Sequence, residues 1–197
     1  MQKIPSMLIV ISGPSGAGKS TLRSMLLKNH PELVYSVSYT TRKPRNGEIN
    51  GVDYYFITKD KFEEMISQNE FLEYANVYGN YYGTSKKFVD EALSSGKPII
   101  LEVDVQGAES IIKLYPQCCS IFIRPSSIEL LIERFVKRGT EDLQDQKKRI
   151  EEIKKELEKE KLFSYIVIND NLTDAYKSFE NTIFSYAQRL NKNGGYR

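Results

Sequence analysis

A glycine-rich segment near the N-terminus has the residues of a phosphate-binding loop. The pattern G-x-x-x-x-G-K-[ST] is matched by Gly13-Pro14-Ser15-Gly16-Ala17-Gly18-Lys19-Ser20, and Thr21 follows directly. The segment lies between the apolar run Met7–Ser12 and a helical pattern that begins at Lys19. Glycines allow backbone N–H groups to converge on phosphate oxygens, and the positive end of the following helix favours anions. The sequence therefore predicts a nucleotide-phosphate site rather than a simple connecting turn.

Two side chains of this loop indicate how a nucleotide would be held. Lys19 would reach the β- and γ-phosphates, and Ser20 would offer its hydroxyl to Mg²⁺. The loop does not identify the acceptor of the phosphoryl group. If water were the acceptor, the protein would be an NTPase, and if a nucleoside monophosphate were the acceptor, it would be a nucleotide kinase. The chain has no N-K-x-D segment, the usual guanine-reading sequence of small GTPases. A GTPase is therefore disfavoured, and other segments must identify the acceptor.

A basic segment suggests a second phosphate site. Arg42 and Arg45 lie three residues apart, and Pro44 between them argues against a continuing helix. Arginine presents a planar fork of donors suited to phosphate, and the hydroxyls of Tyr54 and Tyr82 could add to it. Taken alone, the segment favours a solvated basic loop over a phosphate site, and only other segments can support the site.

A glutamate in an apolar segment could read a base. Glu73 lies between Leu72 and Tyr74, and strand alternation would place it on the opposite face from both. If that face lines a cleft, the carboxylate could accept from the adjacent N1–H and N2–H₂ donors of guanine, whereas adenine presents a lone pair at N1. The alternative is a glutamate that faces solvent.

Short apolar runs alternate with helical patterns through most of the chain. The expected buried strands are Met7–Ser12, Pro98–Val103, Cys118–Ile123 and Tyr165–Ile168. The expected helices are Lys19–Asn29, Ala108–Leu114, Ser127–Lys137 and Thr173–Leu190. Strands that alternate with helices pair in parallel through βαβ crossovers. The sequence therefore predicts an α/β fold with a parallel sheet flanked by helices.

Two further segments differ from this pattern. Residues 35–88 read as a small β-rich insertion, and the charged run Gln144–Lys161 reads as an amphipathic surface helix, compatible with a mobile flap, rather than a coiled coil. The insertion is expected to hold the strands Tyr35–Tyr39, Tyr54–Ile57, Phe71–Val77 and Tyr81–Tyr82, a helix over Lys59–Gln68 and a hairpin tip at Gly79-Asn80.

Composition excludes several classes of protein. The chain has 197 residues and a net charge of +2, so one globular domain is expected and nothing demands a nucleic-acid partner. Its longest apolar run, Met7–Ile11, is too short for a membrane span. Cys118 and Cys119 are neighbours poorly placed for a disulfide, which favours a cytoplasmic setting. His30 is the sole histidine, so a His-based triad or His-rich metal site is excluded.

In this order of segments the sequence resembles the guanylate kinases, which pass a phosphoryl group from ATP to GMP. The segments that carry the resemblance are 13–21, 37–45, Gly47-Glu48, 51–56, 71–73, 79–84, 101–107 and Arg138-Gly139. The resemblance implies one domain with a P-loop parallel-sheet core at about 1–34, 89–126 and 163–197. It also implies a GMP-binding insertion at about 35–88 and a helical lid at about 127–162.

The resemblance also assigns roles to residues. ATP would be bound by the loop from Gly13 to Thr21, by Arg134 and by Asn169. The GMP phosphate would be bound by Arg42, Arg45, Tyr54 and Tyr82, and the guanine by Ser38, Glu73 and Thr84. Glu102 and Asp104 follow a strand, where ligands collect in open α/β sheets, and would serve the GMP or metal side. The catalytic residues would be Lys19, Arg42, Arg138 and Arg149.

The predicted reaction is Mg²⁺-dependent transfer of the γ-phosphoryl group of ATP to GMP or dGMP, by a monomer or homodimer. One alternative is a guanylate-kinase-like module that binds proteins without catalysis, which characteristically has a degraded phosphate loop. The other is a P-loop kinase for a different phosphorylated small molecule.

Overall fold

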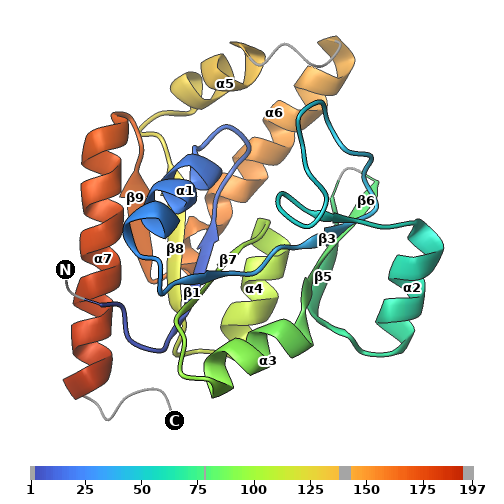
Figure 1. Cartoon of the computed structure of the whole chain (residues 1–197). Coiled ribbons are helices and arrows are strands. Elements are labelled where there is room, and N and C mark those ends of the chain that lie inside the picture. Colours follow the sequence, from blue (N-terminus) through green and yellow to red (C-terminus); the bar gives the residue numbers. More distant parts are fainter. Residues whose placement is uncertain (1–2, 78, 138–142, 193–197) are drawn as a thin grey trace.

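The computed structural model contains one parallel sheet and one smaller sheet (Figure 1). It describes residues 3–77, 79–137 and 143–192, apart from the side chains of 135–137, 143–149 and 191. The parallel sheet has the order β2-β7-β1-β8-β9. Its strands are β1 (Leu8–Ser12), β2 (Val34–Tyr35), β7 (Ile99–Glu102), β8 (Cys119–Arg124) and β9 (Tyr165–Ile168). The predicted α/β fold with a parallel sheet is confirmed.

Helices cover both faces of the parallel sheet. The helices of the described residues are α1 (Lys19–Asn29), α2 (Lys59–Ser67), α3 (Lys86–Ser94), α4 (Val105–Leu114), α5 (Ile128–Lys137), α6 (Leu143–Glu158) and α7 (Leu172–Lys192). Of these, α2 packs against the smaller sheet instead. Alternate residues of β1 enter different cores, because successive side chains of a strand point to opposite faces. Ile9 and Ile11 pack in a cluster with α1 and α7, whereas Leu8 and Val10 pack in a cluster with α3 and α4. The sheet is therefore buried on both faces.

The smaller sheet projects from the side of this core (Figure 1). It has the order β4-β3-β6-β5, with strands β3 (Tyr39–Thr40), β4 (Tyr55–Phe56), β5 (Phe71–Val77) and β6 (Asn80–Ser85). The helix α2 covers it through Phe62, whose ring stacks on Phe71 at 4.3 Å and on Tyr81 at 5.2 Å between centroids. The predicted hairpin is present, although Tyr78 at its tip lies outside the described residues.

For the region 35–94, one predicted strand was wrong and one helix was missed. The run Tyr35–Tyr39 was expected to be one strand, but Tyr35 pairs with Ile100 in the parallel sheet and Tyr39 pairs with Gly83 in the smaller sheet. The helix α3 was not predicted at all. It begins where the side chain of Ser85 accepts a hydrogen bond from the backbone N–H of Phe88. Its apolar residues Phe88, Val89, Ala92 and Leu93 have the spacing of one helix face, so the helical pattern was present in the sequence and was overlooked.

The charged run forms α6 followed by a 3₁₀ turn at Lys159–Leu162. Ile153 is fully buried in the core cluster on the α1 side, and Leu157 packs against both clusters. The run is therefore an amphipathic helix that rests on the core, as predicted, rather than half of a coiled coil.

His30 has a structural place between α1 and α7. It is buried, and its Nε2 lies 2.8 Å from Oε1 of Glu180. The same oxygen accepts from the hydroxyl of Tyr176 at 2.6 Å, and that hydroxyl accepts from Asn29 at 2.7 Å. Burial raises the pKa of Glu180, but the bonds from Tyr176 and His30 outweigh it and leave the pKa below its usual value. The network ties the two helices together away from the cavity described below.

Tyr176→Phe should lower the free energy of unfolding by about 1–2 kcal/mol at pH 7, because two hydrogen bonds are lost at a buried ring. Since the pKa of Glu180 is lowered in the folded state, its contribution is complete above the unfolded value near 4.5 and is lost as pH falls through the folded value. The difference from wild type should therefore be smaller at pH 4 than at pH 7 in urea denaturation. Tyr115→Phe is the control, because its hydroxyl makes only a 3.5 Å contact with Asp90. An equal loss in both variants would contradict the network.

Candidate active site

The glycine-rich loop joins β1 to α1 in a conformation that requires glycine. Gly13 has a φ of +139°, and a Cβ there would lie 2.0 Å from the carbonyl oxygen of Ile123 in β8. Gly18 has a φ of +89° and directly precedes α1. Gly13 therefore allows the loop to pass close to β8. Gly18 allows it to turn into α1, whose N-terminus favours anions.

Lys19 folds back over this loop. Its Nζ lies 2.5 Å from the carbonyl oxygen of Gly13 and 3.0 Å from that of Pro14. These contacts hold the ammonium group at the loop itself, where it can meet a phosphate group that the loop binds.

Two carboxylates lie beside the loop because β7 is parallel to β1. The hydroxyl of Ser20 donates to Oε1 of Glu102 at 2.6 Å. Asp104 caps α4 by accepting from the backbone N–H of Gly107 at 2.9 Å. Burial raises the pKa of Asp104. Hard oxygen donors are thus gathered where the strands end.

Glu73 is buried at the far side of the same hollow. It is 7% exposed, and its Oε1 accepts from the hydroxyl of Thr84 at 2.6 Å. Burial raises the pKa of Glu73 to about 7, and the nearby Asp104 contributes in the same direction, whereas the bond from Thr84 opposes it. The alternative of a solvent-facing glutamate is wrong. A buried carboxylate beside a hydroxyl can accept hydrogen bonds from a polar ring.

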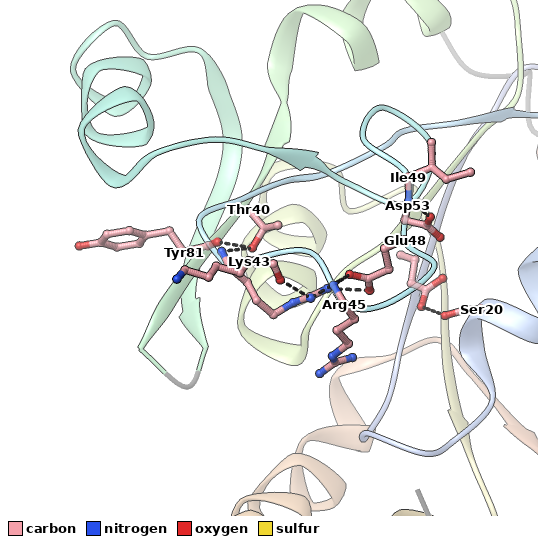
Figure 2. A network of polar contacts seen from close by, with 10 residues as sticks. Ser20, Thr40, Lys43, Arg45, Glu48, Ile49, Asp53 and Tyr81 are labelled. Atoms are coloured by element: carbon pink, nitrogen blue, oxygen red, sulfur yellow. Dashed lines mark hydrogen bonds and ion pairs between the residues drawn. The ribbon is translucent and has the colours of Figure 1, made fainter. Parts of the chain in front are cut away.

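Arg42 is held by a carboxylate that sequence reasoning gave no role. Its two terminal nitrogens lie 2.9 and 2.8 Å from Oε2 and Oε1 of Glu48, which also accepts from the backbone N–H of Arg45 at 2.7 Å. The bond to Glu48 raises the pKa of Arg42. Figure 2 shows Glu48 beside Arg45, whose side chain extends away from this network. Glu48 therefore fixes the side chain of Arg42, whereas Lys43, Pro44 and Arg45 of the same segment are exposed to solvent.

Aromatic rings surround this arginine. The guanidinium carbon of Arg42 lies 5.3 Å from the ring centroid of Tyr54 and 5.7 Å from that of Phe56. The rings of Tyr54 and Tyr82 meet edge to face at 5.8 Å. Burial raises the pKa of Tyr54 to about 12, so its hydroxyl keeps its proton and can donate.

Asn169 and Arg134 are brought to the other side of the loop. The buried side chain of Asn169 donates to the carbonyl oxygen of Ala17 at 2.7 Å. Arg134 donates to the backbone carbonyls of Asn169 at 2.7 Å and Asp170 at 3.1 Å. The segment after β9 is therefore more than a simple turn, because it packs against the glycine-rich loop.

One cavity of about 290 Å³ joins the loop to the smaller sheet. Its lining includes Gly13, Ser15, Gly16, Gly18, Lys19, Ser20, Thr21, Ser38, Arg42, Arg45, Tyr54, Glu73, Tyr82, Glu102 and Asp104. Thr84 reaches it through its bond to Glu73, and Asn169 contacts the loop from behind. Fifteen residues that sequence reasoning singled out thus line one space, although they come from both sheets.

The side chains of two predicted site residues cannot be placed, and three residues at the site were not predicted. Arg138 lies outside the described residues, and Arg149 lies in α6 in the stretch whose side chains are not described. Sequence reasoning missed Glu48, Arg23 and Glu156, which contact or line the site. Lone charged residues give no local signal, because their partners lie far away in the chain.

Two features are absent from the described residues, namely a membrane-spanning helix and a cluster of metal-ligating side chains. No helix in that part of the chain is long and apolar enough to cross a membrane. Nor do three or more His, Cys, Asp or Glu side chains gather there as a metal-binding group.

The comparisons with known proteins agree with the geometry of this cavity. The family model described as guanylate kinase matches residues 6–186. The chain belongs to the guanylate kinase family. A protein named guanylate kinase from Carboxydothermus hydrogenoformans is 49% identical over 174 residues, covering 88% of this chain and 85% of that protein. One from Clostridioides difficile is 44% identical over 186 residues, covering 94% and 91%. A crystal structure of guanylate kinase from Anaplasma phagocytophilum superposes with a TM-score of 0.76 at 29% identity, covering 93% of this chain and 87% of that one.

Gly18→Ala should destabilise this member of the family more than Gly96→Ala does. Both glycines have a positive φ, +89° and +73°, so each alanine should cost about 1–2 kcal/mol of backbone strain. A Cβ at Gly18 would also lie 2.2 Å from Nδ2 of Asn169, whereas nothing lies within 4 Å of a Cβ at Gly96. The midpoints of urea denaturation measure the difference. Equal midpoints would mean that Asn169 does not pack against the loop.

Proposed function

We propose that this protein transfers the γ-phosphoryl group of ATP to GMP or dGMP, giving ADP and GDP or dGDP, as a step of purine nucleotide metabolism. The observation that carries the proposal is the single cavity lined both by the phosphate-binding loop and by Glu73. A kinase for a nucleoside monophosphate needs such a space, because donor and acceptor phosphates must meet in it. The membership in the guanylate kinase family supports the same acceptor.

ATP would bind on the side of the glycine-rich loop. The backbone from Gly13 to Thr21 would surround its phosphates, with the ammonium of Lys19 already directed to the loop. Arg134 and Asn169, which meet behind the loop, would border the adenine. The loop is intact, as a nucleotide-binding member of the family requires.

Mg²⁺ fits the donors that lie beside ATP. Ser20 supplies a hydroxyl oxygen, and Glu102 and Asp104 supply carboxylates at the same edge. Mg²⁺ prefers oxygen ligands and usually keeps waters and substrate phosphates rather than a full protein cage, so a sparse set of side chains suits it. When bound, the ion would supply positive charge to the phosphates. Ser20 would be its protein ligand.

GMP would bind on the side of the smaller sheet. Arg42, Arg45, Tyr54 and Tyr82 would hold its phosphate, since arginine forks and phenol hydroxyls are donors suited to phosphate oxygens. Glu73 would accept from N1–H and N2–H₂ of guanine, with Ser38, Thr84 and Asp104 beside it. Adenine presents a lone pair at N1 and would be rejected.

The transfer itself requires alignment and positive charge rather than a catalytic base. The GMP phosphate is already anionic, and the transition state spreads negative charge over the moving group. Lys19 and Arg42 would offset that charge from the two sides, and the lid residues Arg138 and Arg149 would add to it. Closure of the insertion at 35–88 and of the lid at 127–162 would exclude water as a competing acceptor.

The setting and assembly follow from the same proposal. We expect a cytoplasmic enzyme, where ATP and GMP occur and where two free, buried thiols at Cys118 and Cys119 remain reduced. It would act as a monomer or homodimer on small molecules, without a nucleic-acid or membrane partner.

Lys19→Met should lower the turnover of ATP and GMP by about two to three orders of magnitude, because it removes the cation at the loop. The thermal midpoint should move little, since Lys19 lines a cavity rather than a core. A coupled assay for ADP measures turnover. The control is Lys28→Met, an exposed lysine of the same helix. Near wild-type turnover in folded Lys19→Met would overturn the assignment of the loop.

Glu73→Gln should lower kcat/KM for GMP roughly 10- to 1,000-fold, because a buried guanine donor loses a charged acceptor, at about 1–3 kcal/mol or more. ATP affinity should stay nearly constant. The decisive quantity is the ratio of kcat/KM for GMP to that for AMP, under saturating Mg·ATP. Glu70→Gln, an exposed carboxylate just before β5, is the matched control. An undiminished ratio in Glu73→Gln would show that Glu73 does not read the base.

The pH dependence of that ratio gives an independent check. Because the pKa of Glu73 is about 7, the carboxyl gains its second accepting oxygen as pH rises from 6 to 8. The wild-type preference for GMP should therefore increase over this range, and that of Glu73→Gln should not. Ionisation of the substrate phosphate cancels in the ratio.

A further inference from the structure

Arg23 forms an ion pair with a carboxylate of the site without lining the cavity. Its Nη1 lies 2.9 Å from Oε2 of Glu102, and the two side chains are 15% and 13% exposed. The other oxygen of Glu102 accepts from the hydroxyl of Ser20 at 2.6 Å, and Figure 2 shows the bond at Ser20. Glu102 and Ser20 line the cavity, whereas Arg23 is absent from its described lining. The carboxylate thus joins a residue behind the site to one within it.

An aromatic ring fixes the guanidinium in turn. The guanidinium carbon of Arg23 lies 4.0 Å from the ring centroid of Tyr35, which ends the edge strand β2. This distance places the cation over the ring face, where the ring attracts it. Arg23 lies in the first turns of α1, and Tyr35 pairs with Ile100 of β7. Arg23 therefore extends from α1 to the ring of Tyr35, which the pairing of β2 with β7 fixes in the parallel sheet.

We propose that Arg23 is a positioning residue, which holds Glu102 so that the Ser20 hydroxyl donates its hydrogen to that carboxylate and keeps its oxygen lone pairs available to Mg²⁺. The inference rests on the proposed function, because it concerns the Mg·ATP side of that reaction.

The chemistry of the hydroxyl explains why its direction matters. A serine hydroxyl has one hydrogen to donate and two lone pairs that accept. When the hydrogen points to Glu102, the lone pairs face other directions, and one can ligate a cation. If Glu102 lost its partner, its charge would be free to turn toward the cation or be repelled by the phosphates. In either case Ser20 would lose its fixed acceptor.

The charge of Arg23 has a second consequence. Glu102 and Asp104 place two carboxylates near the path of a polyanionic substrate. Like charges at short range are costly, especially where water is partly excluded. Arg23 compensates Glu102 from outside the cavity, so the carboxylate can orient Ser20 without adding its full negative charge to the phosphate site.

Equilibrium binding of ADP tests the proposal without any turnover. The dissociation constants of ADP with and without Mg²⁺ are measured by titration calorimetry, and their ratio is the effect of the cation. In Arg23→Met this ratio should fall about five- to tenfold, as the loss of one partly buried ion pair predicts. The dissociation constant without Mg²⁺ should rise by a smaller factor, because the loop is intact and only the uncompensated charge of Glu102 then opposes the phosphates.

Conservative variants separate positioning from mere packing. Arg23→Lys keeps the charge but lacks the planar group that stacks on a ring, so it should restore the ratio in part. Tyr35→Phe keeps the ring face and should match wild type, whereas Tyr35→Leu should lower the ratio. Should Arg23→Met fail to fold, the Tyr35 pair and Arg23→Lys still decide the matter. A wild-type ratio in folded Tyr35→Leu and Arg23→Lys would overturn the proposal.

Two further measurements complete the test. Arg189→Met is the matched control, since Arg189 also lies over a tyrosine ring, that of Tyr165 at 5.3 Å, but on α7 away from the cavity. It should leave the ratio unchanged. In a double-mutant cycle, Arg23→Met should have no further effect in a Glu102→Gln background. An undiminished effect there would mean that Arg23 does not act through Glu102.

The two levels of proposal fail in different ways. If wild-type protein bound ADP with no contribution from Mg²⁺, the proposed function would fail and the inference with it. If wild type showed that contribution and folded Arg23→Met showed it equally, only the role of Arg23 would be overturned.

Discussion

The register between β1 and β7 is the constraint on which the rest of the site depends. Ile11 of β1 lies opposite Glu102 of β7, so the glycine-rich loop leaves one strand where the two carboxylates leave the other. The hydroxyl of Ser12 donates to the carbonyl oxygen of Val103 at 2.9 Å and fixes the strands where they diverge. A slip of one residue would move every side chain of the buried strand to the opposite face, which two apolar cores forbid.

Charged side chains of the site are paired with one another before any phosphate is considered. Glu48 holds Arg42, and Arg23 holds Glu102, so neither arginine is left as an isolated buried charge. Unpaired buried charges are costly, and a fixed partner also restricts the rotamers of a long side chain. A phosphate that binds Arg42 would then meet a guanidinium already oriented. The buried acids Glu73 and Asp104 have raised pKa values instead, because burial disfavours their charged forms.

Local patterns in the sequence predicted the elements whose signals are local. The helix at Lys19–Asn29 and the strand at Tyr165–Ile168 have the predicted bounds, because a glycine-rich loop and a short β-branched run define them. Sheet membership is different. The alternation in Tyr35–Tyr39 indicates a strand but does not say which sheet it joins, since pairing depends on residues far away in the chain. The helix α3 was missed for another reason, because its first residues, up to Phe88, were assigned to the β-rich insertion.

The site residues likewise fall into those with a local sequence signal and those without one. Lys19 and Ser20 belong to a motif whose spacing is its own signal, whereas Arg42 and Glu73 gained weight only from the ordered resemblance to a family. Glu48 and Arg23 carried no motif of their own, because an ion pair is visible only when both partners are placed. Glu48 even lay in a segment that supported the resemblance, yet its bond to Arg42 required the fold of the loop between them.

The clearest example of such non-local dependence is a residue with no side chain. Gly107 lies in the first turn of α4, where alanine would favour the helix by about 1 kcal/mol. A Cβ there would lie 2.4 Å from Oε2 of Glu73 and 3.0 Å from Oδ1 of Asp104. Helix propensity alone would therefore favour alanine at position 107. Glycine is required there because the carboxylates of Glu73 and Asp104 occupy the space that a Cβ would need. The parallel sheet sets the position of α4, and the smaller sheet sets the position of Glu73. The end of the cavity that holds Glu73 thus exists only where the two sheets meet, and the missing methyl group at Gly107 is what allows them to meet there.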